Sequence, residues 1–297
     1  MTTPLVPAPP PRTRNHRSAH ALADTAVRAL AEEAELTPKP GLVDARGPGA
    51  HTDMNLATML RSAESLRGAF TDMAQAAQHF TAPTRELRET LADIGRDGER
   101  AMLDATGGVN THRGAIWALG LLVAAAVIEG PYGPEPTEPI ARTAGTIAAL
   151  PDRNTPALDS NGLRAAARYG ASGARGEAIG GFPHALFALR ALRTARIGGA
   201  SEPHARLDAL VTVVASLDDT CLLHRGGREG LAMAQRGARA VLADGGSATS
   251  RGRAALGALD LGLVRAGLSP GGSADLLAAA LFLDRTTSPD AIPSLSS

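Results

Sequence analysis

The stretch Ala115-Ile-Trp-Ala-Leu-Gly-Leu-Leu-Val-Ala-Ala-Ala-Val-Ile128 decides the fold, because fourteen consecutive residues carry no charge. A helix that crosses a membrane needs about 20 apolar residues, and Gly120 interrupts this shorter run. A helix that is apolar on every side is instead buried by other parts of its protein. The stretch therefore predicts a helix at the centre of a folded domain.

Segments on both sides of this stretch repeat their apolar residues at helical spacing. No segment shows sustained apolar–polar alternation, aromatic residues make up only 3%, and alanine is abundant, so intrinsic propensities favour helix. We therefore predict an all-α fold, a single compact domain of roughly ten helices with glycine-rich functional loops. The first three helices are expected to begin at Ser18, Asp53 and Thr84. Together the helices are expected over 18–34, 53–82, 84–106, 112–128, 140–150, 161–170, 183–196, 204–216, 228–243, 251–266 and 273–284.

Both ends of the chain and one internal segment lack this pattern. Residues 1–17 are rich in proline and arginine and have no apolar core of the kind that a secretory signal needs, so we expect a disordered tail. Residues 18–285 form the predicted all-α domain, with the proline-rich segment 129–159 as a peripheral excursion. We expect residues 286–297 to be a flexible tail.

Charge and cysteine content limit the classes of function. Thirty basic and thirty acidic residues cancel, which argues against nucleic acid or an anionic membrane as a partner. The single cysteine, Cys221, permits no disulfide within the chain, so we expect a reducing cytoplasm.

The loop 35–55 has the composition of a binding site. Lys39, which is the only lysine of the chain, lies between two prolines that stiffen the backbone, and three glycines follow it. The charged and polar side chains of this loop are able to hold a phosphate and a hard cation: Glu35, Lys39, Asp44, Arg46, His51, Asp53 and Asn55. The alternative is a rigid surface loop in which Asp53 caps the next helix.

Two further glycine-rich stretches precede predicted helices. At 107–115 the N-terminus of the central helix offers free amides for a phosphate, and Arg113 adds a cation. The alternative there is that Asn110 and Thr111 cap the helix and that His112 lies on the surface. The stretch 169–183 carries Arg175 and Glu177 among many glycines, which suits either a backbone wrapped around a ligand or an ion pair in a flexible linker.

The stretches 217–227 and 269–278 complete the set. The first contains paired carboxylates able to hold Mg²⁺ and two further cationic or titratable groups, namely Asp218, Asp219, His224 and Arg225. Cys221 is not expected to be a nucleophile, because no orienting group accompanies it. In the second stretch Ser273 is expected to cap the last helix, and Asp275 either favours its first turn or faces a pocket. If these loops converge, the ligand is a polyphosphate nucleotide.

With these motifs the chain resembles the triphosphoribosyl-dephospho-coenzyme A synthases over roughly residues 19–284. The resemblance rests on Thr37-Pro-Lys-Pro-Gly-Leu-Val-Asp44, Gly49-Ala-His-Thr-Asp-Met54, Asn110-Thr-His-Arg-Gly114, Gly173-Ala-Arg-Gly-Glu177, Asp219-Thr-Cys-Leu-Leu-His-Arg-Gly-Gly227 and Pro270-Gly-Gly-Ser-Ala-Asp-Leu-Leu277. The residues of two of these motifs are more similar to the branch of the family associated with malonate decarboxylase than to the citrate lyase branch. The resemblance implies that ATP loses adenine and that its triphosphoribosyl unit joins the ribose 2′-hydroxyl of 3′-dephospho-CoA. It also implies Mg²⁺ bound with ATP, and a product used for the acyl carrier subunit of the decarboxylase.

Residue chemistry then suggests roles that the resemblance does not settle. We expect the nucleotide and its phosphates to be bound by Lys39, Asn110, Arg113, Arg175, Arg225 and Asp275. The predicted metal ligands or stabilisers of positive charge at the ribose are Asp44, Asp53, Asp218 and Asp219. Glu35 or Glu177 is the predicted base, and the predicted proton donors to adenine are His51, His112 and His224.

Two other functions fit the same residues. A metal-dependent nucleotide or ADP-ribosyl hydrolase would release adenine without dephospho-CoA. A non-catalytic helical partner of the decarboxylase complex would show no thermal shift with ATP and no loss on changing Lys39 to alanine. The oligomeric state is left open by the sequence.

Overall fold

The computed structural model describes residues 18–130, 137–154 and 160–287, and over these ranges the chain is all-α, as predicted. Its helices are α1 (Ala19–Glu35), α2 (Leu56–Ser65), α3 (Arg67–Ala77), α4 (Arg85–Thr106), α5 (Arg113–Glu129), α6 (Thr137–Ala149), α7 (Asn161–Tyr169), α8 (Gly173–Ile179), α9 (Pro183–Ile197), α10 (Glu202–Val214), α11 (Thr220–Ala243), α12 (Ser250–Arg265) and α13 (Gly271–Thr287). None of these described helices is long and apolar enough to span a membrane.

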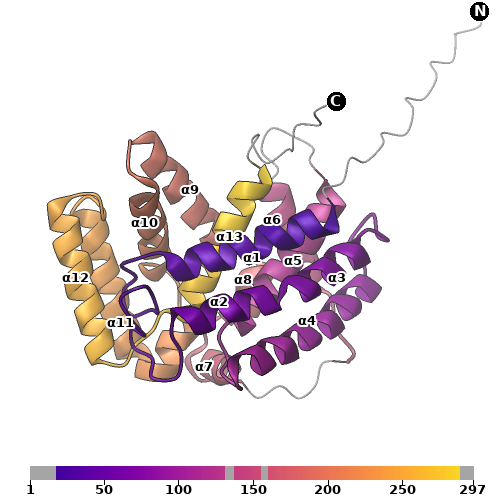
Figure 1. Cartoon of the computed structure of the whole chain (residues 1–297), viewed down its shortest axis with the longest axis horizontal. Coiled ribbons are helices and arrows are strands. Elements are labelled where there is room, and N and C mark those ends of the chain that lie inside the picture. Colours follow the sequence, from indigo (N-terminus) through magenta and orange to yellow (C-terminus); the bar gives the residue numbers. More distant parts are fainter. Residues whose placement is uncertain (1–17, 131–136, 155–159, 288–297) are drawn as a thin grey trace, which may run out of the picture.

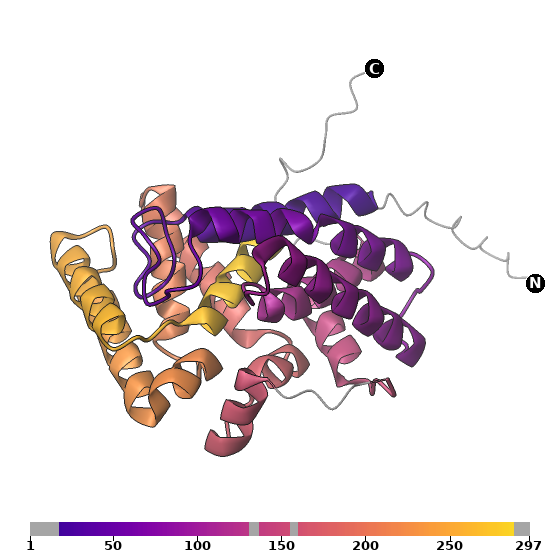
Figure 2. The ribbon, with the colours of Figure 1, turned by 60° about the horizontal axis from the view of Figure 1, so that its bottom comes forward.

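Helix α5 is the centre of the fold, as its apolar sequence predicts. Its residues are buried on all sides, and it packs against α3, α4, α6 and α13. Helices α3 and α4 lie on one side of the molecule and α9 to α12 on the other, and α1 runs across the middle in front of α13 (Figure 1). Turning the molecule shows the same division, with α7 and α8 along the lower edge (Figure 2). The N-terminal ends of α5 and α13 meet, because Asp275 in the first turns of α13 packs on Gly114 of α5.

Several predicted helix boundaries were wrong for local reasons. The segment 53–82 forms two helices that separate at Leu66, and the first begins at Leu56, because the side chain of Asn55, not Asp53, accepts the amide of Thr58. The segment expected to start at 228 is part of α11, which begins at Thr220 and bends at Gly227 with a φ of 59°.

Two further differences concern the C-terminal half. Residues 173–179, expected to be a glycine-rich loop, form the short helix α8. Ser273 does not cap α13, because the helix begins two residues earlier, and the helix continues to Thr287 into the predicted tail. The predicted tail 1–17 and the segments 131–136 and 155–159 of the predicted excursion lie outside the described residues.

The loop between α1 and α2 is held against α12 by a set of ion pairs. The carboxylate of Asp44 accepts the amide of Lys39 at 2.8 Å and pairs with Arg46, which also pairs with Asp260 of α12 at 2.7 Å. Asp260 also accepts the amide of Gly41. Gly41 has a φ of 70°, and a Cβ there would lie 2.5 Å from the carbonyl oxygen of Leu268. The loop therefore has a fixed conformation, which places Lys39 against the end of α1.

Candidate functional site

Five polar side chains form a cluster in the interior, at the N-terminal ends of α5, α11 and α13. This central cluster consists of Glu33, Lys39, His112, Asp219 and Asp275. Its members either bond directly or lie close enough for the charge of one to shift the pKa of another. The cluster brings together four residues that the sequence placed on four separate loops.

Lys39 and Glu33 form a buried ion pair within the cluster. Their side chains are 1% and 4% exposed, and Lys39 Nζ lies 2.6 Å from Glu33 Oε1. The ammonium also donates to the backbone carbonyl of Glu33 at 2.6 Å, at the last turn of α1. Lys39 is thus not a free phosphate ligand in this structure, because its charge is already neutralised by Glu33.

Asp219 is buried and bonded on both carboxylate oxygens. It accepts the amide and the hydroxyl of Ser273, each at 2.8 Å, and the amide of Cys221 at 2.8 Å. Burial nevertheless raises its pKa, against the lowering effect of these hydrogen bonds. Asp219 is the N-cap of α11, and its bonds join the first turns of α11 and α13. Its role as predicted metal ligand would require it to exchange some of these partners.

Asp275 is the most perturbed carboxyl group of the cluster. Burial raises its pKa well above the ordinary value, and the negative charges of Glu33 and Asp219 raise it further. The amide of Ala115 donates to it, which attaches it to the first turn of α5. It also packs directly on Gly114, where a Cβ would lie 2.1 Å from Asp275 Oδ2. Asp275 is only partly buried, so it forms the accessible edge of the cluster.

His112 is a neutral imidazole with one unused nitrogen. Its Nδ1 bonds to Ser62 Oγ at 2.7 Å, whereas its buried Nε2 has no hydrogen-bond partner. Burial, followed by the charge of Lys39, lowers its pKa to about 3. At neutral pH it is therefore not the protonated donor to adenine that we expected. Its free Nε2 is a buried polar atom that a ligand would satisfy.

A second group of predicted residues lies where the loop 36–55 meets α11 and the loop between α12 and α13. His51 Nε2 lies 2.9 Å from Ser269 Oγ, and its Nδ1 lies 3.2 Å from the guanidinium of Arg225. Burial, followed by the charge of Arg225, lowers the pKa of His51 and so disfavours its protonated form. Arg225 also donates to the carbonyl oxygens of Ala50 and Gly267, and Asp53 is exposed beside His51.

A third group lies at the start of α9. Glu177 of α8 is buried and accepts the amide of His184, while its other oxygen lies 2.7 Å from His184 Nδ1. This hydrogen bond, opposed by burial, raises the pKa of His184, and Asp218 adds a smaller contribution of the same sign. Glu177 is thus half of a carboxylate–histidine pair, which differs from the free base that we predicted.

The remaining predicted residues do not join the central cluster. The guanidinium of Arg113 pairs with Glu99 of α4, and Asn110 accepts the amide of Arg113 at 3.2 Å. The amides of Arg113 and Ala115, in the first turn of α5, are therefore bonded to protein oxygens and not free for phosphate as predicted. Glu35, His224 and Arg175 are exposed.

The predicted metal ligands are dispersed. Asp44 is bonded within its own loop, Asp53 and Asp218 are exposed, and Asp219 is bonded as described above. Among the described residues no group of three or more His, Cys, Asp or Glu side chains is arranged to hold a metal ion. Mg²⁺ needs only one or two protein carboxylates when phosphate oxygens and water supply the rest. The acidic edge formed by Asp275 near Glu33 and Asp219 fits that requirement, and Mg²⁺ stays a prediction.

Sequence reasoning missed Glu33, Ser62 and His184. Glu33 follows Leu30 by three residues and so falls on the apolar stripe of α1, where a charge is unexpected. Ser62 lies on the buried face of α2 in the same way. These polar residues on apolar stripes were available as a signal. His184 gave no comparable signal, because it depends on the position of α8.

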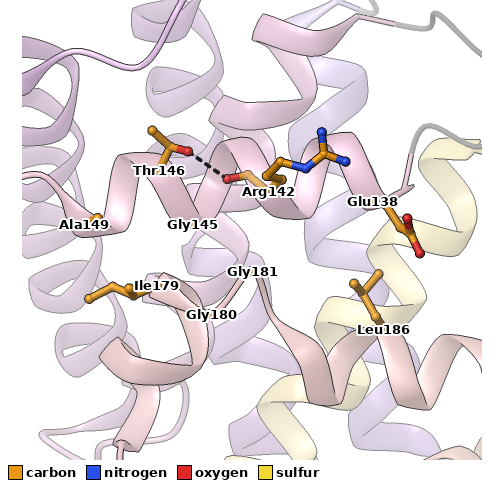
Figure 3. A pocket seen from close by; sticks show the side chains of 9 residues that line it. All are labelled: Glu138, Arg142, Gly145, Thr146, Ala149, Ile179, Gly180, Gly181 and Leu186. Atoms are coloured by element: carbon orange, nitrogen blue, oxygen red, sulfur yellow. Dashed lines mark hydrogen bonds between the residues drawn. The ribbon is translucent and has the colours of Figure 1, made fainter.

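A surface pocket of about 490 Å³ lies apart from the cluster, between α6 and the junction of α8 and α9 (Figure 3). It contains none of the cluster residues and no predicted site residue. Its lining is Glu138, Arg142, Gly145, Thr146, Ala149, Ile179, Gly180, Gly181 and Leu186.

Comparison with known proteins gives a consistent result over most of the chain. A family model described as "ATP:dephospho-CoA triphosphoribosyl transferase" matches residues 19–293. A protein of Klebsiella pneumoniae named "2-(5''-triphosphoribosyl)-3'-dephosphocoenzyme-A synthase" is 54% identical over 89% of this chain and 94% of its own length. Relatives from Azotobacter vinelandii and Pseudomonas aeruginosa (strain UCBPP-PA14) are 55% and 57% identical, over 90% and 89% of this chain and 91% and 90% of their own lengths. Both are named "Probable 2-(5''-triphosphoribosyl)-3'-dephosphocoenzyme-A synthase".

Proposed function

The chain belongs to the ATP:dephospho-CoA triphosphoribosyl transferase family, and on this premise we propose that it joins the triphosphoribosyl unit of ATP to the ribose 2′-hydroxyl of 3′-dephospho-CoA with release of adenine. The match of the family model to residues 19–293 carries the proposal, because this range includes every element of the central cluster.

The reaction exchanges one bond to the ribose C1 of ATP for another. The bond from C1 to N9 of adenine breaks, with its electron pair going to adenine, and a bond from C1 to the acceptor 2′-oxygen forms. The proton lost by the hydroxyl balances the proton gained by adenine. Positive charge develops at C1 and its ring oxygen, so nearby carboxylates stabilise the transition state.

Asp275 is the residue that we assign as the base, which takes the proton of the acceptor 2′-hydroxyl. A group that moves a proton works best when its pKa lies near the working pH, and burial with like charges is the usual way to raise a carboxyl pKa toward that range. Asp275 has both features and is partly accessible, whereas Glu35 is exposed and Glu177 is paired with His184. Burial is the main cause of the raised pKa of Asp275, and the charges of Glu33 and Asp219 raise it further.

Other residues of the cluster fit a role in holding the substrate. The free Nε2 of His112 is an unsatisfied polar atom beside Lys39, suited to a hydrogen bond with the nucleotide. Mg²⁺ bound with ATP would be held by Asp219, and would neutralise triphosphate charge. We further propose that the product is used for the acyl carrier subunit of malonate decarboxylase, because the residues of two motifs are more similar to that branch of the family.

Product analysis tests the proposal. The protein is incubated with Mg²⁺-ATP and 3′-dephospho-CoA, and the products are separated and weighed by mass spectrometry. We expect free adenine and a compound equal to the sum of the two substrates less adenine. Release of ADP or pyrophosphate instead, or of adenine without any acceptor, would rule out the transfer. A deletion strain that loses growth on citrate but not on malonate would rule out the assignment to malonate decarboxylase.

A further inference from the structure

Arg88 of α4 is a buried cation. Its side chain belongs to a residue only 9% exposed, and its Nε has no partner among the described residues. A buried charge is costly unless it is paired and hydrogen-bonded. Burial lowers the pKa of Arg88, and the charges of Arg175 and Arg96 lower it further.

Arg88 lies on an aromatic platform that α5 and α8 hold in place. Its guanidinium is stacked over the ring of Trp117, with its Cζ 4.9 Å from the ring centroid. The indole of Trp117 donates to the carbonyl oxygen of Ala174 at 3.2 Å, which places the next residue, Arg175, beside this arrangement. The stacking holds the plane of the Arg88 guanidinium but uses none of its N–H groups, so they stay available to a ligand.

Neighbouring carboxylates do not fully offset this positive charge. The charge of Asp152 raises the pKa of Arg88, but the carboxylate itself pairs with Arg96 at 3.3 Å. Glu89 also acts on Arg88, but it pairs with Arg153 at 2.7 Å. No ion pair of Arg88 or Arg175 is found in the described part of the chain. Two neighbouring arginines without a bonded carboxylate are suited to bind an anion.

We propose that Arg88 and Arg175, positioned by the ring of Trp117, bind phosphate oxygens of one of the two nucleotide substrates. The inference rests on the proposed function for the identity of those substrates. The phosphate belongs either to the triphosphate of ATP or to the diphosphate of 3′-dephospho-CoA. The site is distinct from the α5 N-terminus, where Arg113 already pairs with Glu99.

Isothermal titration calorimetry of the full chain tests the inference with four probes: inorganic pyrophosphate, tripolyphosphate, Mg²⁺-ATP and 3′-dephospho-CoA. The variants are Arg88→Gln, Arg88→Lys and Arg175→Gln. Arg190→Gln is the matched control, because Arg190 is also stacked on an aromatic ring, 4.6 Å from the centroid of Phe187, on the exposed side of α9. Circular dichroism and thermal melting check that each variant is folded.

We expect Arg88→Gln and Arg175→Gln each to weaken the binding of one nucleotide at least tenfold. The inorganic probe with the same number of phosphates as that nucleotide should lose affinity as well, and Arg190→Gln should bind all four probes like the wild type. Weaker Mg²⁺-ATP binding assigns the triphosphate, and weaker dephospho-CoA binding assigns the diphosphate. Affinities within twofold of the wild type for all four probes would overturn the inference. If Arg88→Gln does not fold, the affinities of Arg175→Gln alone test the inference, since the side chain of Arg175 is exposed and its replacement should not disturb the fold.

The two proposals fail in different ways. Wild-type protein that makes no adenine but binds pyrophosphate through Arg88 would contradict the proposed function and leave the anion site standing. Adenine release at the wild-type rate and affinity in both arginine variants would contradict the anion site and leave the function standing.

Discussion

Replacing Lys39 by methionine tests whether the buried ion pair of the central cluster supports the fold, the reaction or both. The pair is almost completely buried, with 2.6 Å between Lys39 Nζ and Glu33 Oε1. Removing one partner of such a pair leaves the other charge uncompensated, which costs about 3–5 kcal/mol. The whole free energy of unfolding of a domain is on the order of 5–15 kcal/mol. We therefore expect Lys39→Met to lose a large part of the stability.

The double variant Lys39→Met/Glu33→Met separates stability from activity. Replacing both charges by apolar side chains of similar size is close to neutral for stability, because no uncompensated charge stays buried. The double variant should thus unfold in urea near the wild-type midpoint. It should release adenine more slowly than the wild type, since the charge of Glu33 no longer adds to the raised pKa of Asp275.

A surface pair provides the control for this experiment. Arg100 and Asp97 form an ion pair on α4 with side chains 69% and 66% exposed. Exposed pairs contribute about 0–1 kcal/mol, so Arg100→Ala should be nearly neutral in the same urea titration. If Lys39→Met is as stable as Arg100→Ala, the argument from burial is refuted. A fully active double variant would refute the role of the pair in the reaction.

Three other variants, with a fourth as a control, test Asp275 and its surroundings. Gly114→Ala should lower activity about a hundredfold, because the added Cβ would displace Asp275 and small misplacements of a reacting group are costly. Gly257→Ala is the control, because a Cβ added at this position of α12 meets no atom within 4 Å, and it should keep full activity. A carboxyl with a raised folded pKa binds a proton on folding, so stability should fall as pH rises from about 4 toward that pKa. Asp275→Asn should reduce this slope in urea titrations at several pH values, and an unchanged slope would contradict the raised pKa. Burial, followed by the charges of Asp219 and Asp275, also raises the pKa of the Cys221 thiol. Cys221→Ser should therefore keep activity within about threefold, and alkylation of the wild type by iodoacetamide should be slow at pH 8; an inactive Cys221→Ser protein that is folded would revive the nucleophile hypothesis.

Local pattern was enough to predict the helical architecture. The uncharged run 115–128 indicated the central helix, because burial on every side needs no knowledge of the neighbours. Thr84 and Gly107 were recognised as the ends of α4, since a side-chain cap and a glycine of positive φ act within a few residues. The break at Leu66 was missed because the apolar stripe continues across it.

Residues of four predicted loops meet in the central cluster, whereas Arg113 and Arg175 lie outside it, and the partners of each side chain could not be predicted. Lys39 was singled out by its flanking prolines, yet its neutralisation depends on how the chain turns back onto Glu33 at the end of α1. The bonds of Asp219 to Ser273 join residues 54 positions apart, and no periodicity reports on such a contact. Likewise, only the packing of α13 on α5 shows that Asp275 accepts a hydrogen bond from the amide of Ala115, which we had expected to be free for phosphate.

The most direct measurement is the rate of adenine release from Mg²⁺-ATP, with and without 3′-dephospho-CoA, by the wild type and by Asp275→Asn. The wild type should release one adenine for each dephospho-CoA consumed and almost none when the acceptor is left out. Asp275→Asn should still show the thermal shift caused by ATP but should release adenine at least about a hundredfold more slowly, as loss of a proton-transferring group predicts. Adenine release by Asp275→Asn at the wild-type rate would contradict the account.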